Sequence, residues 1–342
     1  MDEQEKQDDQ KIQGDQRELL LKIAHCNIAD RILDLLISGM DEKEILDELR
    51  NERGEGNKRQ SDDSVCIDNC VKICSHQKEL LEASDSKQEF TKAMFHVPEP
   101  WNGNLKTAEI LFVGSNPNIN LKEDFPKFES EEWSEDKKNE VVVFFSDRLN
   151  RLDLENDIKN TRYWREIYKY AAWILEATDP SWAVDKENEE DKKREIDSRV
   201  ALTEIVHCKS KDETGVPEAT QKCFKKYTKK VIEYFLNTTS GSGNKKIVVF
   251  VGAKARDLIC AGASTNTNNV DRKKIAKYFG VSSENALFLC FPHPSPKSTQ
   301  WKTWNSGKVV KLGDRKEGRK REETIKKIIY EELKQYGYSL PS

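Results

Sequence analysis

The sequence has no hydrophobic run long enough to cross a membrane. A transmembrane helix needs about 20 consecutive apolar residues, whereas 35% of this chain is charged and no window approaches that length. The first residues are acidic and polar, unlike the basic and then apolar start of a secretory signal. We therefore expect a soluble, cytoplasmic protein with no membrane partner.

Several ligand-binding signatures are also missing. The 342 residues contain no G-x-G-x-x-G loop, no P-loop and no internal repeat. The net charge is −4, whereas proteins that bind nucleic acids usually carry a basic excess. A role with nucleic acid would depend on a local basic surface. A basic cluster does lie near the C-terminal end, although a solvated helix face would have the same composition. It comprises Lys297, Lys302, Lys308, Lys311, Arg315, Lys316, Arg319, Lys320, Arg321, Lys326 and Lys327.

Four short apolar runs are typical of buried β-strands, because they are uninterrupted and rich in β-branched and aromatic residues. They are Ile110–Val113, Ala201–Val206, Ile247–Gly252 and Leu287–Phe291. Between them, residues 161–175 and 218–236 carry apolar side chains at helical spacing. This alternation predicts an α/β fold, a three-layer α/β/α sandwich with a central four-stranded parallel sheet.

Residues 1–60 are acidic, and we expect them to form a helical extension. Leu19–Ile37 is dense in apolar residues, and Asp41 is placed to cap a further helix. A linker-like composition over Arg53–Ser64 separates this extension from a domain that we expect to span residues 61–342. We expect the helices to pack on that domain, with binding of a protein partner or of DNA as the alternative.

Polar loops follow the first and the last of the predicted strands. The string Gly114-Ser115-Asn116-Pro117-Asn118 follows the first strand, and His293-Pro294-Ser295-Pro296 follows the last. Open α/β sheets bind ligands where their parallel strands end. We therefore expect the Asn116 amide and the His293 imidazole, both on loops stiffened by proline, to face one site.

The ordered pair of motifs resembles the uracil-DNA glycosylase superfamily. Its members have a G-x-N-P or G-x-D-P loop after the first strand and an H-P-S-P loop after the last. The resemblance covers about residues 95–338. It implies a monofunctional DNA glycosylase, which flips a deaminated or modified base out of DNA and hydrolyses its N-glycosidic bond to leave an abasic site. No motif lysine is placed for Schiff-base chemistry, so no lyase activity is expected.

The resemblance also implies roles for individual residues. Asn116 would orient the attacking water and contact the base. His293 would donate a hydrogen bond to a base carbonyl oxygen as negative charge builds there. The other candidates for base binding are Ser115, Pro117 and the stacking aromatics Phe125 and Phe128, of which Phe128 is preferred. The candidates for contact with the DNA itself are Ser295, Lys297, Ser298, Gln300 and Trp301.

Glu204 departs from the family pattern. The uracil-reading members usually carry Asn at this place on the second strand, four residues before Cys208 here. An ionised Glu only accepts hydrogen bonds, so it would repel uracil O4 and accept from an exocyclic amino group. Glu204 therefore favours a cytosine-like, adenine-like or otherwise modified base. A protonated Glu204 in a dry pocket could still read uracil, and one that turns away to an ion pair would read no base.

Eight cysteines are present, and a cytoplasmic protein rarely uses them for disulfides. Cys66, Cys70 and Cys74 are spaced to share one face of a helix, Cys208 follows the second strand, and Cys223 lies in the next helix. The iron–sulfur branches of the superfamily have two early cysteines, usually as C-x2-C, and two more after the second strand. The resemblance implies a structural [4Fe–4S] cluster held by Cys70, Cys74, Cys208 and Cys223, with Cys66 as an alternative ligand. Four thiolates also suit zinc.

Two other functions remain open at this point. An inactive relative on the same fold would bind nucleic acid or a protein partner without cleaving a bond. A small-molecule α/β enzyme would match the H-P-S-P string by chance. Within the glycosylase class, a modified base such as those of phage DNA would indicate phage defence, and a deaminated base would indicate DNA repair.

Overall fold

The computed structural model describes residues 3–52, 61–84, 90–119, 123–129, 132–148, 162–179, 182, 189–211, 213–238, 245–267, 270–294, 300–304, 308–312 and 318–338. The chain forms two compact units. The first consists of Met1–Trp101, Asn116–Ser146 and Thr203–Val231, and the second of Asn102–Ser115, Asp147–Leu202 and Ile232–Ser342. Within the described ranges, no helix is long and apolar enough to span a membrane.

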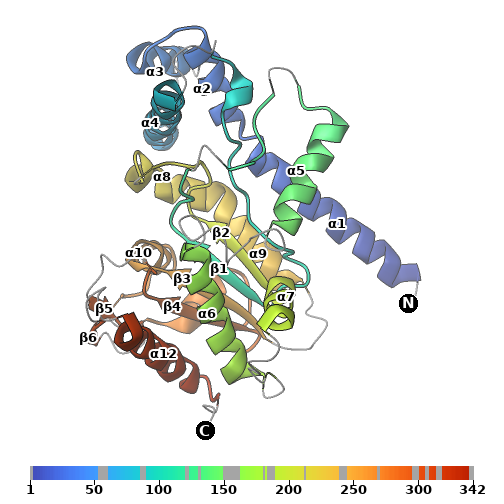
Figure 1. The fold of residues 1–342 in the computed structure, drawn as a ribbon, viewed down its shortest axis with the longest axis vertical. Coiled ribbons are helices and arrows are strands. Elements are labelled where there is room, and N and C mark those ends of the chain that lie inside the picture. Colours follow the sequence, from blue (N-terminus) through green and yellow to red (C-terminus); the bar gives the residue numbers. More distant parts are fainter. Residues whose placement is uncertain are drawn as a thin grey trace. The chain divides into compact units, whose positions relative to one another are not determined.

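A four-stranded parallel sheet forms the centre of the α/β fold. Its strands are β1 (Ile110–Gly114), β2 (Val200–Glu204), β3 (Lys246–Val251) and β4 (Ala286–Phe291). Their order in the sheet is β2-β1-β3-β4 (Figure 1), with Ile110 opposite Ile247 and Lys246 opposite Ala286. Every strand residue is buried, as expected for a sheet that is covered on both faces. The predicted fold class is therefore confirmed.

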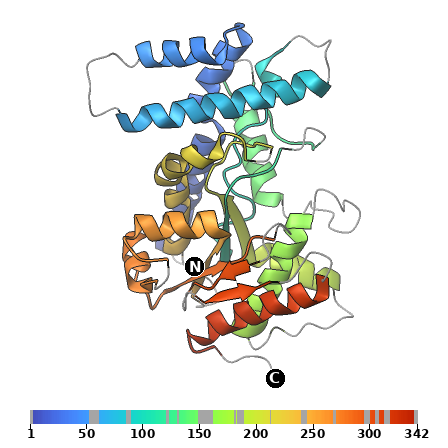
Figure 2. The ribbon, with the colours of Figure 1, turned by 90° about the vertical axis from the view of Figure 1, so that its left-hand side faces the viewer.

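Helices of the second unit cover this sheet. They are α6 (Arg162–Thr178), α7 (Glu189–Arg199), α9 (Lys229–Asn237, which begins in the first unit), α10 (Ala253–Gly262), α11 (Arg272–Tyr278) and α12 (Gly318–Lys334). Figure 2 shows α10, which packs on β3, and α12, which packs on β4 and α6, on opposite sides of the strands. A short antiparallel pair, β5 (Gln300–Lys302) and β6 (Val309–Lys311), follows β4 along the chain.

The first unit is mainly helical. It contains α1 (Glu3–Ala24), α2 (Asn27–Ile37), α3 (Glu42–Asn51), α4 (Ser61–Ser84), the 3-10 turn η2 (Lys92–Met94), α5 (Glu135–Asp147, whose last residue belongs to the second unit) and α8 (Val216–Cys223). A π-helical turn, η5 (Phe224–Thr228), joins α8 to α9. The helix predicted over 218–236 is therefore a continuous helical segment with a distorted centre. Helix α4 packs on α2, α3 and α8.

Asp41 caps the start of α3, as the sequence predicts. Its side chain accepts a hydrogen bond from the backbone N–H of Glu44 at 2.9 Å, and the Glu44 side chain accepts from the Asp41 N–H at 2.9 Å. This reciprocal cap satisfies two backbone donors that the helix itself leaves unbonded. The expected boundary at residue 60 lies outside the described residues, and the helices on both sides of it belong to the same unit.

Candidate functional site

The side chain of Asn116 is bound to the segment that follows β2. Its Nδ2 donates hydrogen bonds to the backbone oxygens of Val206 at 3.2 Å and Cys208 at 2.6 Å. Its Oδ1 accepts one from the Ser210 hydroxyl at 2.7 Å. The Ser210 N–H also donates to the Pro117 oxygen at 3.2 Å. The loop after β1 and the segment after β2 are thus fastened together through Asn116.

These bonds define what the amide of Asn116 can still do. An amide has two N–H donors and an oxygen with two lone pairs. Both donors are occupied by backbone oxygens, and Ser210 occupies one lone pair. The second lone pair of Oδ1 can accept a hydrogen bond from water, whereas no N–H remains for a base.

His293 follows β4 in the second unit and is partly exposed. Its ring lies 5.5 Å from that of Tyr163, centroid to centroid. A Cβ added at Gly252, whose φ is +93°, would lie 3.3 Å from His293 Cβ. The preceding Pro292 oxygen accepts a hydrogen bond from the Tyr170 hydroxyl at 3.2 Å. Sequence reasoning identified His293 but missed Tyr163, Tyr170 and Gly252, which position it.

The loops that carry the two motifs start from the same edge of the sheet. Strands β1 and β4 both run parallel to β3, so the chain leaves β1 at Gly114 and β4 at Phe291 from the carboxyl edge. Asn116 belongs to the first unit and His293 to the second. Their convergence on one ligand remains a prediction from the sequence.

The two candidate stacking aromatics are packed within the first unit. Phe125 is 3% exposed, with the Lys209 ammonium 3.5 Å from its ring centroid and the His96 ring 5.0 Å away. Phe128 is 2% exposed and lies edge-on to Trp133 at 6.3 Å. In this arrangement both rings contribute to the interior.

Lys209 is a buried charge that sequence reasoning missed. Its ammonium lies 3.1 Å from a Glu123 carboxylate oxygen and 3.5 Å from one of Glu99, and its side chain is 1% exposed. The Gln77 amide donates to its backbone oxygen at 2.7 Å. A charge buried to this degree requires paired partners. Lys209 is followed by Ser210, Lys211 and Asp212, so its sequence context does not distinguish it from an exposed lysine.

Glu204 lies at the end of β2 and is 5% exposed. Its backbone oxygen accepts a hydrogen bond from the Thr228 hydroxyl at 3.0 Å. Nearby, His207 Nδ1 donates to the Glu99 oxygen at 2.7 Å, and burial lowers the His207 pKa to about 4, so its ring is neutral. The end of β2 is therefore a dry environment for the Glu204 carboxyl.

The candidates for contact with DNA are only partly described. Ser295, Lys297 and Ser298 lie outside the described residues. Gln300 is exposed on β5, whereas Trp301 is 4% exposed beneath the Arg256 guanidinium, 5.4 Å from its ring centroid. Exposed cations near this hairpin and on α12 are Lys308, Lys311, Arg319, Lys320 and Lys327.

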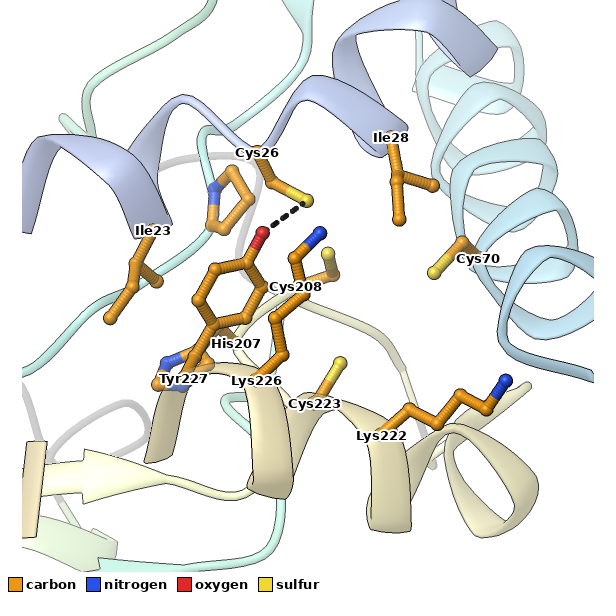
Figure 3. Close-up of a pocket in the computed structure, with 11 residues that line it drawn as sticks. Ile23, Cys26, Ile28, Cys70, His207, Cys208, Lys222, Cys223, Lys226 and Tyr227 are labelled. Atoms are coloured by element: carbon orange, nitrogen blue, oxygen red, sulfur yellow. Dashed lines mark hydrogen bonds between the residues drawn. The ribbon is translucent and has the colours of Figure 1, made fainter. Parts of the chain in front are cut away.

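Four cysteines line one cavity in the first unit (Figure 3). Cys26 immediately precedes α2, Cys70 lies on α4, Cys208 on the segment after β2, and Cys223 at the end of α8. Figure 3 shows their sulfur atoms around a common space, which Tyr227 also borders. Cysteines from four separate segments thus meet at one place.

The cavity lining differs from the predicted ligand set at one position. Cys74 lies one turn along α4 from Cys70, is 5% exposed and does not line the cavity. Burial, together with the smaller effect of the nearby Cys26 thiol, raises the pKa of the Cys74 thiol to about 12. Cys26, which the sequence analysis did not consider, lines the cavity instead. The side chain of Cys66 lies outside the described residues.

The four thiols of the cavity can be compared with the ligands that zinc and a [4Fe–4S] cluster require. Across the described part of the chain, no three His, Cys, Asp or Glu side chains are close enough to hold one metal ion. Zinc binds thiolates at about 2.3 Å, which requires a tighter group. A cluster places iron and sulfide between its cysteines, and its usual ligands are four thiolates. The cavity offers four thiols and no carboxylate, a donor type that suits both, and the absence of a group tight enough for one metal ion favours a [4Fe–4S] cluster over zinc among the described residues.

Comparisons with known proteins do not extend the resemblance. No model of a known protein family matches the chain, and no curated protein is significantly similar to it. The features that bear on function are therefore the two motifs, the strands that they follow and the convergent cysteines.

Proposed function

We propose that this protein is a monofunctional DNA glycosylase that hydrolyses the N-glycosidic bond of an extruded base. The observation that carries the proposal is the strand order β2-β1-β3-β4, with the Gly-Ser-Asn-Pro loop after β1 and the His-Pro loop after β4. Both loops leave the carboxyl edge of a parallel sheet, where α/β proteins bind their ligands. DNA is the proposed partner and the cytoplasm the proposed location.

In the proposed mechanism, His293 acts on the leaving base and Asn116 acts on the attacking water. Cleavage of the base–sugar bond builds positive charge on the sugar and negative charge on the base. His293, supported by Tyr163 and Gly252, would donate a hydrogen bond to a base carbonyl oxygen as that negative charge develops. Asn116 would accept from the attacking water through the remaining lone pair of Oδ1. Because an amide cannot remove a proton, most of the rate acceleration would come from stabilising the leaving base.

As an ionised carboxylate, Glu204 would favour a base with an exocyclic amino group. A carboxylate accepts from such a group, as Glu does from cytosine N4. The proposed substrate class is therefore a cytosine-like, adenine-like or modified base. A modified cytosine of phage DNA would make the protein a defence enzyme, and a deaminated base would make it a repair enzyme.

The proposed cofactor is a structural [4Fe–4S] cluster in the four-cysteine cavity. When bound, the cluster would supply cross-links between segments, since hydrolysis needs no electron transfer. The Cys208 backbone oxygen already accepts the Asn116 amide at 2.6 Å. Holding the Cys208 segment would therefore also hold Asn116.

An inactive nucleic-acid-binding relative is the second candidate. It is favoured by Phe125, whose ring is covered by Lys209 and His96 instead of open to a stacked base. A protein partner of residues 1–60 belongs to this alternative as well. Intact Asn116 and His293 favour the enzyme.

Mass spectrometry of released bases tests the proposal. The protein is incubated with single- and double-stranded DNA containing uracil, hypoxanthine or modified cytosines, and with phage DNA. We expect one free base and a matching abasic site, both lost in Asn116→Ala and His293→Ala while DNA binding persists. If no substrate releases a base, or if both variants act like the parent, the proposed function is wrong.

A further inference from the structure

The cavity of Figure 3 includes a residue from the N-terminal helices. Cys26 lies between α1 and α2, is 7% exposed, and borders the cavity together with its neighbours Ile23 and Ile28. The other side chains of α1 and α2 that are described as buried are aliphatic and pack in the interior. A thiol at this one position, opposite three other thiols, therefore has a role that packing alone does not require.

A hydrogen bond to the sulfur of Cys26 strengthens this assignment. The Tyr227 hydroxyl donates to Cys26 Sγ at 3.4 Å, and the phenol is 5% exposed. Donors aimed at ligand sulfurs are a regular feature of iron–sulfur sites, where they tune the reduction potential. Lys222 and Lys226 also line the cavity and would balance the negative charge of a thiolate-bound cluster.

Cys74 is the competing ligand from the sequence, and its position argues against it. It shares α4 with Cys70, yet only Cys70 borders the cavity. Helix α4, which packs on α2, α3 and α8, presents Cys70 to the cavity and not Cys74.

We propose that Cys26, not Cys74, completes the cluster ligands with Cys70, Cys208 and Cys223, and that Tyr227 hydrogen-bonds the ligated Cys26 sulfur. This inference rests on the proposed cluster but not on glycosylase activity. It makes the N-terminal helices a part of the cofactor site. Removing them would remove a ligand.

The test compares Cys26→Ser with Cys74→Ser in the full chain, purified without oxygen and reconstituted with iron and sulfide. The readouts are iron and sulfide per chain and absorbance near 400 nm. We expect Cys26→Ser to lose most of its iron, at least severalfold relative to the parent, while Cys74→Ser keeps the parental content. The reverse pattern, or equal retention by both variants, would overturn the proposal. Far-UV circular dichroism establishes that each variant is folded.

Tyr227→Phe provides a measurement that does not depend on loss of a ligand. It should keep the parental iron content and lower the reduction potential of the cluster, because a donor to the thiolate sulfur is gone. An unchanged potential would show that Tyr227 does not contact a ligated sulfur. If the parent protein takes up no iron, the proposed cluster is refuted. Base release is measured in a separate assay, so this result does not decide the proposed function. Iron uptake without base release would refute only the enzyme.

Discussion

Removing the charge of Lys209 should destabilise the first unit strongly. In Lys209→Met, the aliphatic stem is preserved, but the ammonium that lies 3.5 Å from Glu99 and 3.1 Å from Glu123 is lost. The Glu99 side chain is 4% exposed, so water cannot replace the cation there, whereas Glu123 is 26% exposed and can be hydrated. Breaking a buried ion pair from one side typically costs about 3–5 kcal/mol. We expect Lys209→Met to lose stability in this range.

Two matched variants separate the buried charge from other effects. Lys209→Met combined with Glu99→Gln leaves no buried carboxylate opposite the methionine, so it should recover much of the loss. Arg50→Met breaks the Arg50–Asp68 pair, whose side chains are 52% and 38% exposed, and should cost no more than about 1 kcal/mol.

Urea unfolding followed by circular dichroism and by tryptophan fluorescence measures all three variants. The reasoning would be refuted if Lys209→Met were as stable as Arg50→Met, or if the double variant were less stable than Lys209→Met. Either result would mean that Glu99 does not depend on Lys209 for its charge.

Three further predictions concern the second unit and the base. Burial lowers the pKa of Lys246 from 10.5 to about 8, so the unfolded chain binds the proton first as the pH falls. The stability that the parent gains relative to Lys246→Met should therefore rise between pH 8 and 10.5, by up to about 3 kcal/mol; a difference between the two proteins that stays constant over that range would contradict the shift. Gly252→Ala adds a Cβ 3.3 Å from His293 Cβ at a φ of +93°, so base release should fall at least tenfold with DNA binding unchanged, and parental rates would show that Gly252 does not position His293. Glu204→Gln, which adds an amide donor to an acceptor, should shift release from amino-bearing bases toward uracil in competition assays; an unchanged preference would remove Glu204 from base recognition.

The fold could be predicted because its signals are local. The four apolar strands are uninterrupted and their burial is complete, and Asp41 forms the cap that its spacing indicates. Helical spacing also placed Cys70 and Cys74 on one face of α4, but spacing does not tell which of them meets a cavity. That depends on where other elements pack.

The missed residues share one physical reason. Cys26 is far from the other cysteines in sequence, and only tertiary packing brings it to the cavity. Lys209 has an ordinary sequence context, and its burial depends on carboxylates from two remote segments. Gly252 matters only because His293 follows the neighbouring strand. Each of these contacts joins distant parts of the chain, which periodicity and local motifs do not encode.

The bond from Asn116 to the Cys208 backbone would make the proposed catalysis depend on iron supply if the proposed cluster is bound. If the cluster holds Cys208, then oxidation that strips its iron would loosen the segment that aligns the water. Activity would fall although neither Asn116 nor His293 had changed. In a cell that is short of iron or exposed to peroxide, the protein would then be inactive although its amount had not changed.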